Sequence, residues 1–172
     1  AQKNLKIIAF EDLAYKNFDL IILAVKPKDA LSAEAKIFKA SPQAEILSVV
    51  AGITLDKYSK PDAVIRSMPN TASSFGKGLT ALYALNQESN AFKIAQKLFS
   101  RVGHVFIMSN EDEMHQFTSI IGSGQAFLFQ VLNTYLKEFE KISIVNRVSP
   151  NEAFKDFVSS LGDLFIQDSD FE

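Results

Sequence analysis

Three short segments, each at the end of an apolar run, hold the first residues that could contribute to chemistry. They are Ala24-Val25-Lys26-Pro27, Val49-Val50-Ala51-Gly52 and Met68-Pro69-Asn70-Thr71. In open parallel sheets, ligands bind beyond the carboxyl ends of the strands, where backbone groups are free to contact them. Small residues there admit a flat ligand, and Asn70 adds a side-chain amide. Together the segments predict one binding crevice, although each alone also fits an ordinary turn.

Two further segments carry groups that could contact a small ligand. Gly122-Ser123-Gly124 interrupts a helical pattern, and each glycine in a helix costs about 1 kcal/mol relative to alanine. The break fits either backbone amides open to a ligand, with the Ser123 hydroxyl beside them, or a tight helix crossing. Glu111 could face a positively charged imine or amine, but a carboxylate in a first helical turn also complements the helix dipole.

Composition narrows the chemistry further. The 172 residues include no cysteine and two histidines far apart, which excludes a thiol nucleophile and gives no basis for a metal centre. We therefore expect no metal, and a reaction carried by a bound cofactor. The net charge of -2 provides no basic excess for binding nucleic acid. No apolar run approaches the roughly 20 residues that cross a bilayer, so we expect a cytoplasmic protein without a membrane partner.

The elements that would position these groups alternate between strands and helices in the first half of the chain. Continuous apolar runs at residues 19–25, 45–50 and 63–68 predict strands that are buried on both faces. Residues 79–85 and 104–108 predict two more strands. Because helical stretches separate most of these runs, the sequence indicates right-handed crossovers and a parallel sheet.

From residue 110 onward the pattern becomes helical. Asn110 and Glu113 predict a capping box at the start of a helix. A long apolar stripe follows, at Leu128, Val131, Leu132, Tyr135, Leu136 and Phe139. Ser149 and Pro150 predict the start of another helix. The change of periodicity predicts a domain boundary between residues 109 and 110.

In their order and spacing, these segments resemble the pyrroline-5-carboxylate reductases. Residues 19–27 are similar to the family's aspartate-apolar-AVKP strand, and residues 47–54 to its strand running into AAG[VI]T. Residues 64–71 match V-x-R-x-MPNTP up to its last proline, and residues 118–126 resemble T-x-x-x-GSGPA. Four motifs in family order are far more specific than any one of them.

The resemblance implies an α/β fold with two domains. Residues 1–109 would be part of a Rossmann-like, parallel-sheet domain that binds NADPH or NADH, and residues 110–172 part of an all-helical domain for dimerisation and substrate binding. The implied assembly is a homodimer or a higher oligomer of dimers. The implied reaction passes a hydride to the C=N carbon of 1-pyrroline-5-carboxylate and gives proline.

Carried over by position, the resemblance implies two groups of site residues. Those that would bind the cofactor are Ala24, Lys26, Val49, Ala51, Met68 and Asn70. Those that would bind the substrate are Glu111, Ser123 and Gly124. The family's substrate-contacting threonine belongs to an SPGG[TS]T segment with no counterpart up to Glu172, so no catalytic residue is assigned.

The sequence also departs from the family pattern. The GxGxMG turn and the two strands around it have no counterpart, so we expect a fragment, or a sheet that lacks two strands from its middle. Ala72 and Gln125 each replace a family proline. These departures leave two alternatives open: a catalytically impaired reductase-like protein that binds dinucleotides or regulates, and another small NADP-dependent oxidoreductase.

Overall fold

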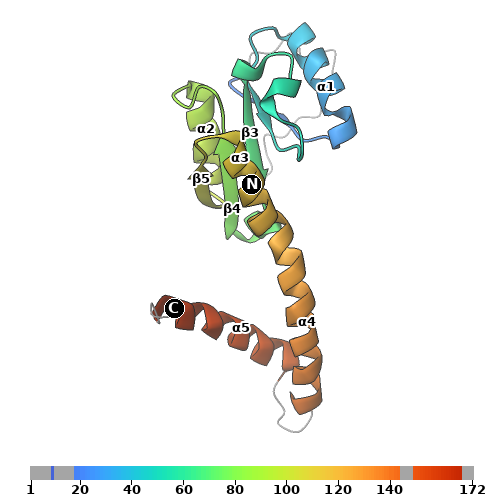
Figure 1. Ribbon diagram of the computed structural model, residues 1–172, viewed down its shortest axis with the longest axis vertical. Helices are drawn as coiled ribbons and strands as arrows, with labels where there is room; N and C mark the ends of the chain where they lie inside the picture. The colour runs from blue at the N-terminus through green and yellow to red at the C-terminus, as the bar shows by residue number, and fades with distance from the viewer. Residues whose placement is uncertain (1–8, 10–17, 144–148, 168–172) are drawn as a thin grey trace. The chain divides into compact units, whose positions relative to one another are not determined.

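The computed structural model describes residue 9, residues 18–143 and residues 149–167 (Figure 1). The chain forms two compact units, residues 1–122 and residues 123–172. Within the described ranges, no helix is both long enough and apolar enough to span a membrane.

The first unit is built on a five-stranded sheet whose strands pair in chain order, β1-β2-β3-β4-β5. The strands are β1 (Ile21–Leu23), β2 (Ile46–Ser48), β3 (Val64–Pro69), β4 (Gly78–Tyr83) and β5 (Gly103–Ile107). β1, β2 and β3 are parallel, β4 is antiparallel to β3, and β5 is parallel to β4. The α/β class predicted from the sequence is confirmed.

One pairing in the predicted parallel sheet is antiparallel. Only residues 70–77 connect β3 to β4, fewer than the dozen or so that a parallel crossover needs. The 3-10 turn η4 (Thr71–Phe75) lies in this connection, and the chain reverses there. The five strands of the described residues form one continuous sheet. The expected absence of two family strands remains a prediction.

Strand β1 lies at one edge of this sheet and pairs only with β2 among the described strands. Its central residue, Ile22, keeps 51% of its surface exposed. Phe18, Leu20, Ile21 and Ile22 together line a shallow groove of about 200 Å³ along this edge. Among the described residues, this edge is therefore apolar and has no strand on its outer side.

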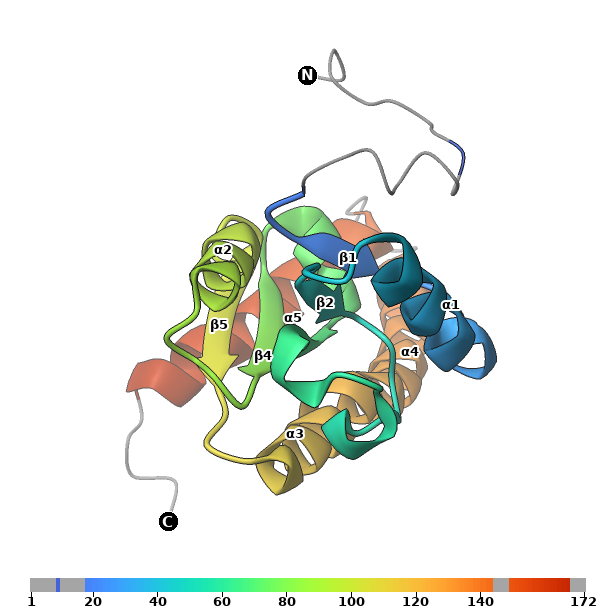
Figure 2. The ribbon, with the colours of Figure 1, turned by 90° about the horizontal axis from the view of Figure 1, so that it is seen from above.

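Helices cover both faces of the sheet (Figure 2). α1 (Pro27–Ala40) packs on the face to which Val64 points, and α2 (Asn90–Phe99) packs on the face to which Ile65 points. Consecutive strand residues thus alternate between two buried clusters, as strands covered on both faces require. This double burial explains the continuous apolar runs of β2 and β3. The prediction that β1 is buried on both faces is wrong, because Ile22 is 51% exposed at the edge of the sheet.

α3 (Glu111–Phe117) begins with the cap that the sequence predicted. The Glu113 N–H donates to Asn110 Oδ1 (3.0 Å), and Glu113 Oε2 accepts the Ser109 N–H (2.7 Å). Met114 is buried in a cluster with residues of the sheet, so α3 packs within the first unit. The domain boundary between residues 109 and 110 remains a prediction.

A π-helical segment (Thr118–Ser123) follows α3 directly. Helical hydrogen bonding therefore widens at the predicted break instead of stopping. The Thr118 hydroxyl donates to the Met114 carbonyl (2.7 Å), which supports the turn where the widening begins. Short π-helical turns inside α-helices are rare and occur frequently at functional sites.

β4 and β5 begin at two glycines that face each other in register, Gly78 and Gly103. The Gly78 N–H donates to the Val102 carbonyl (2.8 Å). A Cβ atom on Gly103 would lie 1.9 Å from the Gly78 carbonyl oxygen, and Gly103 has a φ of +153°. This backbone contact is possible only because Gly103 has no side chain.

The second unit contains α4 (Gly124–Ser143) and α5 (Pro150–Gln167), and α5 begins at the predicted Pro150. The two helices pack through aromatic rings: the Phe139 ring lies 5.6 Å from that of Phe154 and 5.3 Å from that of Phe157. Part of the predicted apolar stripe stays exposed, including Leu128 (63%) and Val131 (55%).

Candidate functional site

The carboxyl ends of β1, β2 and β3 lie at the same edge of the sheet. Leu23 pairs with Ser48, and Ser48 pairs with Arg66, so the three strands run in register before β3 extends further. The Val49 N–H donates to the Leu23 carbonyl (3.1 Å), which ties the segment after β2 to the end of β1. All three segments singled out in the sequence therefore follow strand ends on one side of the sheet.

The six residues predicted to bind a cofactor differ in accessibility. Ala24, Lys26 and Ala51 are exposed, whereas Val49, Met68 and Asn70 are half-buried. The exposed positions include two alanines, whose small side chains leave the backbone open to a flat ligand. Their role in binding remains a prediction.

A buried hydrogen bond fixes the end of β2. Ser48 Oγ accepts the Val50 N–H (3.2 Å) and lies 2.8 Å from the Tyr58 hydroxyl oxygen. Tyr58 is 3% exposed, and burial raises the pKa of its hydroxyl above the ordinary value of 10.0, although the hydrogen bond with Ser48 acts in the opposite direction. Tyr58 therefore supports the strand end that leads into Val49 and Ala51.

The raised pKa of Tyr58 predicts a specific alkaline destabilisation. Because ionisation is less favourable in the folded state, the stabilisation is complete below the unfolded pKa near 10.0 and is lost as pH rises through the folded pKa. Tyr58→Phe should cost about 1 kcal/mol at pH 8 but show a smaller decline in the free energy of unfolding at higher pH. Urea denaturation across this range measures both effects. Tyr83→Phe is the matched control, and an equal decline in both variants would contradict the assignment.

Asn70 closes β3 and holds the start of β4. The Leu79 N–H donates to Asn70 Oδ1 (3.0 Å), and the Ser73 N–H donates to the Asn70 carbonyl (3.2 Å). This bonding fixes the amide orientation, and the Asn70 Nδ2 donor is buried without a hydrogen-bond partner among the described residues. Asn70 therefore stabilises the turn after β3, which was one of the two roles expected from the sequence. It also presents an unused hydrogen-bond donor at the end of the strand.

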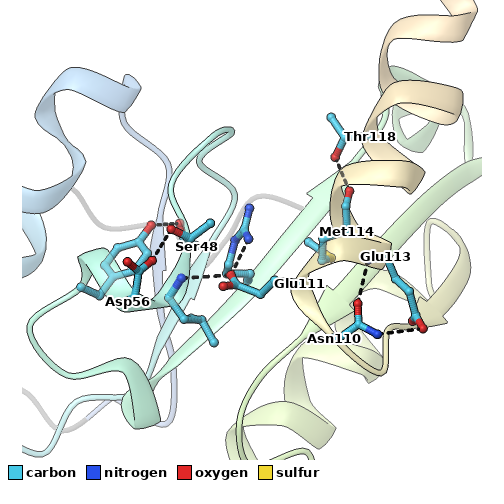
Figure 3. A network of polar contacts seen from close by, with 11 residues as sticks. Ser48, Asp56, Asn110, Glu111, Glu113, Met114 and Thr118 are labelled. Atoms are coloured by element: carbon cyan, nitrogen blue, oxygen red, sulfur yellow. Dashed lines mark hydrogen bonds and ion pairs between the residues drawn. The ribbon is translucent and has the colours of Figure 1, made fainter.

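Glu111 forms an ion pair that the sequence analysis did not predict (Figure 3). Its Oε1 atom lies 2.5 Å from Arg66 Nη1 and also accepts the Leu55 N–H (3.0 Å). The Arg66 side chain is 7% exposed and that of Glu111 24%. One carboxylate oxygen of Glu111 is therefore already bound by other residues of the protein. Glu111 does more than complement the dipole of its helix.

Gly122 brings the π-helical segment close to the end of β3. A Cβ atom on Gly122 would lie 3.6 Å from the Met68 Cε atom and 3.6 Å from the Thr118 methyl carbon. Ser123 ends the π-helical segment and is exposed, and Gly124 is the first residue of α4. Ser123 and Gly124 belong to the second unit, so their role in substrate binding stays a prediction.

The groups gathered at this edge suit binding and positioning more than proton transfer. They offer exposed positions at Ala24 and Ala51, one side-chain amide and a carboxylate that is already paired. An open α/β sheet with helices on both faces and small residues after its strands has a Rossmann-like architecture.

No family model matches the chain, but individual proteins do. It is 33% identical over 155 residues to pyrroline-5-carboxylate reductase 1 of Bacillus spizizenii, covering 86% of this chain and 52% of the relative. It is 34% identical over 144 residues to pyrroline-5-carboxylate reductase 1 of Bacillus subtilis, covering 80% of this chain and 48% of the relative. The chain belongs to the pyrroline-5-carboxylate reductase family, as the motifs predicted.

Solved structures agree on the fold. A Plasmodium falciparum pyrroline carboxylate reductase with NADP bound superposes with a TM-score of 0.75 at 21% identity, over 99% of this chain and 66% of that one. A pyrroline-5-carboxylate reductase from Coxiella burnetii gives a TM-score of 0.67 at 24% identity, over 88% of this chain and 58% of that one. The chain spans about half the length of the curated relatives it matches.

Proposed function

We propose that the protein reduces 1-pyrroline-5-carboxylate to proline with NADPH or NADH. The observation that carries this proposal is the convergence of three family motifs at one edge of the sheet, after β1, β2 and β3. The names of the sequence relatives support the same activity, and the Plasmodium structure with NADP bound supports the cofactor class.

The residues present fit a nicotinamide dinucleotide. Ala24 and Ala51 leave exposed backbone at two strand ends, and the buried Asn70 Nδ2 lacks a partner among the described residues. An unused buried donor is costly unless a ligand or water accepts its hydrogen bond. We propose that Lys26, Val49 and Met68 complete the cofactor contacts. The bound cofactor would supply the hydride, and the protein would supply position and electrostatics.

The proposed substrate residues are Glu111, Ser123 and Gly124. In the overall reaction, the C=N carbon accepts a hydride and the ring nitrogen accepts a proton, which gives the amine of proline. The Glu111 carboxylate would stabilise positive charge on the ring nitrogen, and the Ser123 hydroxyl and Gly124 backbone would hold the substrate carboxylate. No residue is assigned as the proton donor.

An assay of the full-length protein tests the proposal. We expect reduced nicotinamide to be oxidised only when 1-pyrroline-5-carboxylate is present, with proline as the product. Glyoxylate and other carbonyl compounds serve as controls for a different oxidoreductase specificity. Cofactor binding without turnover would favour the alternative raised by Gln125, a reductase-like protein that binds dinucleotides but does not catalyse the reaction.

We further propose a homodimer, or a higher oligomer of dimers, assembled through the helical unit. Large apolar side chains remain exposed on α4, including Phe127 (70%), Leu128 (63%) and Phe129 (65%). A groove of about 330 Å³ between α4 and α5 adds Leu132 and Phe154 to the apolar surface. Contiguous apolar surface on a helical unit of this size favours a partner of the same kind.

The assembly prediction can be tested by sedimentation. The protein should sediment as a dimer or larger at micromolar concentration, and Leu128→Glu should shift it toward the monomer because a charge would be buried in the interface. Lys137→Glu, on an exposed position of the same helix, is the control. A wild-type monomer would contradict the proposed interface. No nucleic-acid or membrane partner is proposed, and a cytoplasmic location remains a prediction.

A further inference from the structure

Arg66 is a charged residue inside a strand that is otherwise apolar or uncharged. It follows Val64 and Ile65, which are 0% and 2% exposed, and is itself 6% exposed. Its guanidinium contacts Glu111 Oε1, which lies on α3 and also accepts the Leu55 N–H. One ion pair therefore joins β3, α3 and the loop that contains Leu55.

The sheet itself does not require an arginine at this position. Removing a guanidinium from water is costly, and a well-packed apolar residue often serves the fold of a protein as well as a buried ion pair does. An ion pair fixes the orientation of the carboxylate, because the guanidinium holds one of its oxygens in place. The pairing is thus more informative about the placement of Glu111 than about the stability of β3.

Two contacts, one residue pair after the other, fix the position of α3 against β3. Arg66 and Met68 are two residues apart on the strand and point to the same face, while Glu111 and Met114 are three residues apart on the helix. Arg66 contacts Glu111, and Met68 packs in the cluster that contains Met114. The end of the Met68 side chain also lies next to Gly122. The ion pair therefore helps to fix Met68 at the strand end.

We propose that Arg66 is a positioning residue that acts through Glu111. By holding Oε1, it leaves Oε2, which accepts no hydrogen bond from the described residues, as the oxygen available to a cationic ligand. It also keeps Met68 in register with α3. This inference rests on the proposed function, since it assigns Glu111 Oε2 to the ring nitrogen of the pyrroline substrate.

The kinetic test compares variants of the full-length protein. Arg66→Leu should lower kcat/KM for 1-pyrroline-5-carboxylate on the order of 10- to 100-fold, as loss of a charge-assisted contact does, while the KM for the cofactor, which this ion pair affects only through Met68, changes by a smaller factor. Arg66→Lys should restore part of the loss because it keeps the charge. Ile65→Ala, which weakens the opposite face of β3, should leave kcat/KM unchanged. The Arg66→Leu and Glu111→Ala pair should not be additive.

The outcomes of the kinetic test distinguish a failure of the Arg66 proposal from a failure of the proposed function. Unchanged kcat/KM in Arg66→Leu, or full additivity with Glu111→Ala, would overturn the proposal. If Arg66→Leu does not fold, Arg66→Lys carries the same comparison with a smaller expected loss. Absence of turnover by the wild-type protein would overturn the proposed function instead.

A second measurement does not depend on activity. The chain has 3 methionines, and Met68, Met108 and Met114 all belong to one cluster, so methyl-labelled methionine gives a small set of signals. Arg66→Lys and Glu111→Ala should move the methyl resonances of Met68 and Met114 in the same direction and leave that of Met108 nearly in place. Unmoved signals of Met68 and Met114 would overturn the positioning role.

Discussion

Gly103→Ala should remove much of the stability of the first unit. The added methyl group would meet the Gly78 carbonyl oxygen at 1.9 Å and the Gly78 carbonyl carbon at 2.5 Å, both of which are backbone atoms. Overpacking and backbone strain each cost about 1–3 kcal/mol, so the sum is several kcal/mol. Domains are typically stable by only about 5–15 kcal/mol. The free energy of unfolding from urea denaturation, followed by circular dichroism, measures the loss.

Gly76→Ala separates the two contributions. Gly76 also has a left-handed φ, +71°, but no atom lies within 4 Å of the position that its Cβ would occupy. Its substitution should therefore cost only the conformational penalty, about 1 kcal/mol. If both substitutions lower the free energy of unfolding equally, the backbone at Gly78 and Gly103 must relax to accept the added methyl group. That result would contradict the close contact.

Asn70→Ala should lower kcat on the order of 100-fold with both substrates saturating, because a small misplacement of the hydride donor is amplified in the transfer step. Two atoms of Asn70 contribute in different ways. Oδ1 accepts the Leu79 N–H and so fixes the chain between β3 and β4. Nδ2 is the unused donor that we assign to the cofactor. Steady-state rates with saturating cofactor and substrate measure the change.

Asn70→Asp distinguishes the two roles. Aspartate keeps an acceptor for the Leu79 N–H but lacks the Nδ2 donor. If the donor binds the cofactor, Asn70→Asp should recover the thermal stability lost in Asn70→Ala without recovering kcat. If recovery of stability restores kcat as well, Asn70 serves only the turn, and its place among the cofactor residues is wrong.

The positions of the strands were predictable because their burial leaves a clear pattern. Strands covered on both faces need continuous apolar runs. β1 and β2 lie inside the runs that the sequence shows, and β3 extends one residue beyond its run, to Pro69. The cap at Asn110 was predictable for a similar local reason, since a polar acceptor before a helix bonds its first free N–H groups. The direction of β4 was not predicted, although the shortness of residues 70–77 carried the signal.

The ion pair between Arg66 and Glu111 could not be located from the sequence because its partners are 45 residues apart. A single arginine within an apolar strand does signal a buried partner, but several acidic residues could serve. The same applies to Ser48 and Tyr58, whose hydrogen bond depends on how the loop after β2 folds back. Side-chain pairs of this kind depend on tertiary placement, which local patterns do not encode.

The open edge at β1 has a practical consequence for the behaviour of the chain in solution. Among the described strands, β1 is paired on one side only, so its other side presents unpaired backbone groups, and apolar side chains such as Ile22 make it a template for strands from other molecules. Neither proline nor a charged side chain interrupts Ile21–Leu23, the usual protection against such pairing. We therefore expect insoluble assembly of this chain to begin when a strand of another molecule pairs with β1. This route is separate from association through α4. Any segment that covers the edge should affect it.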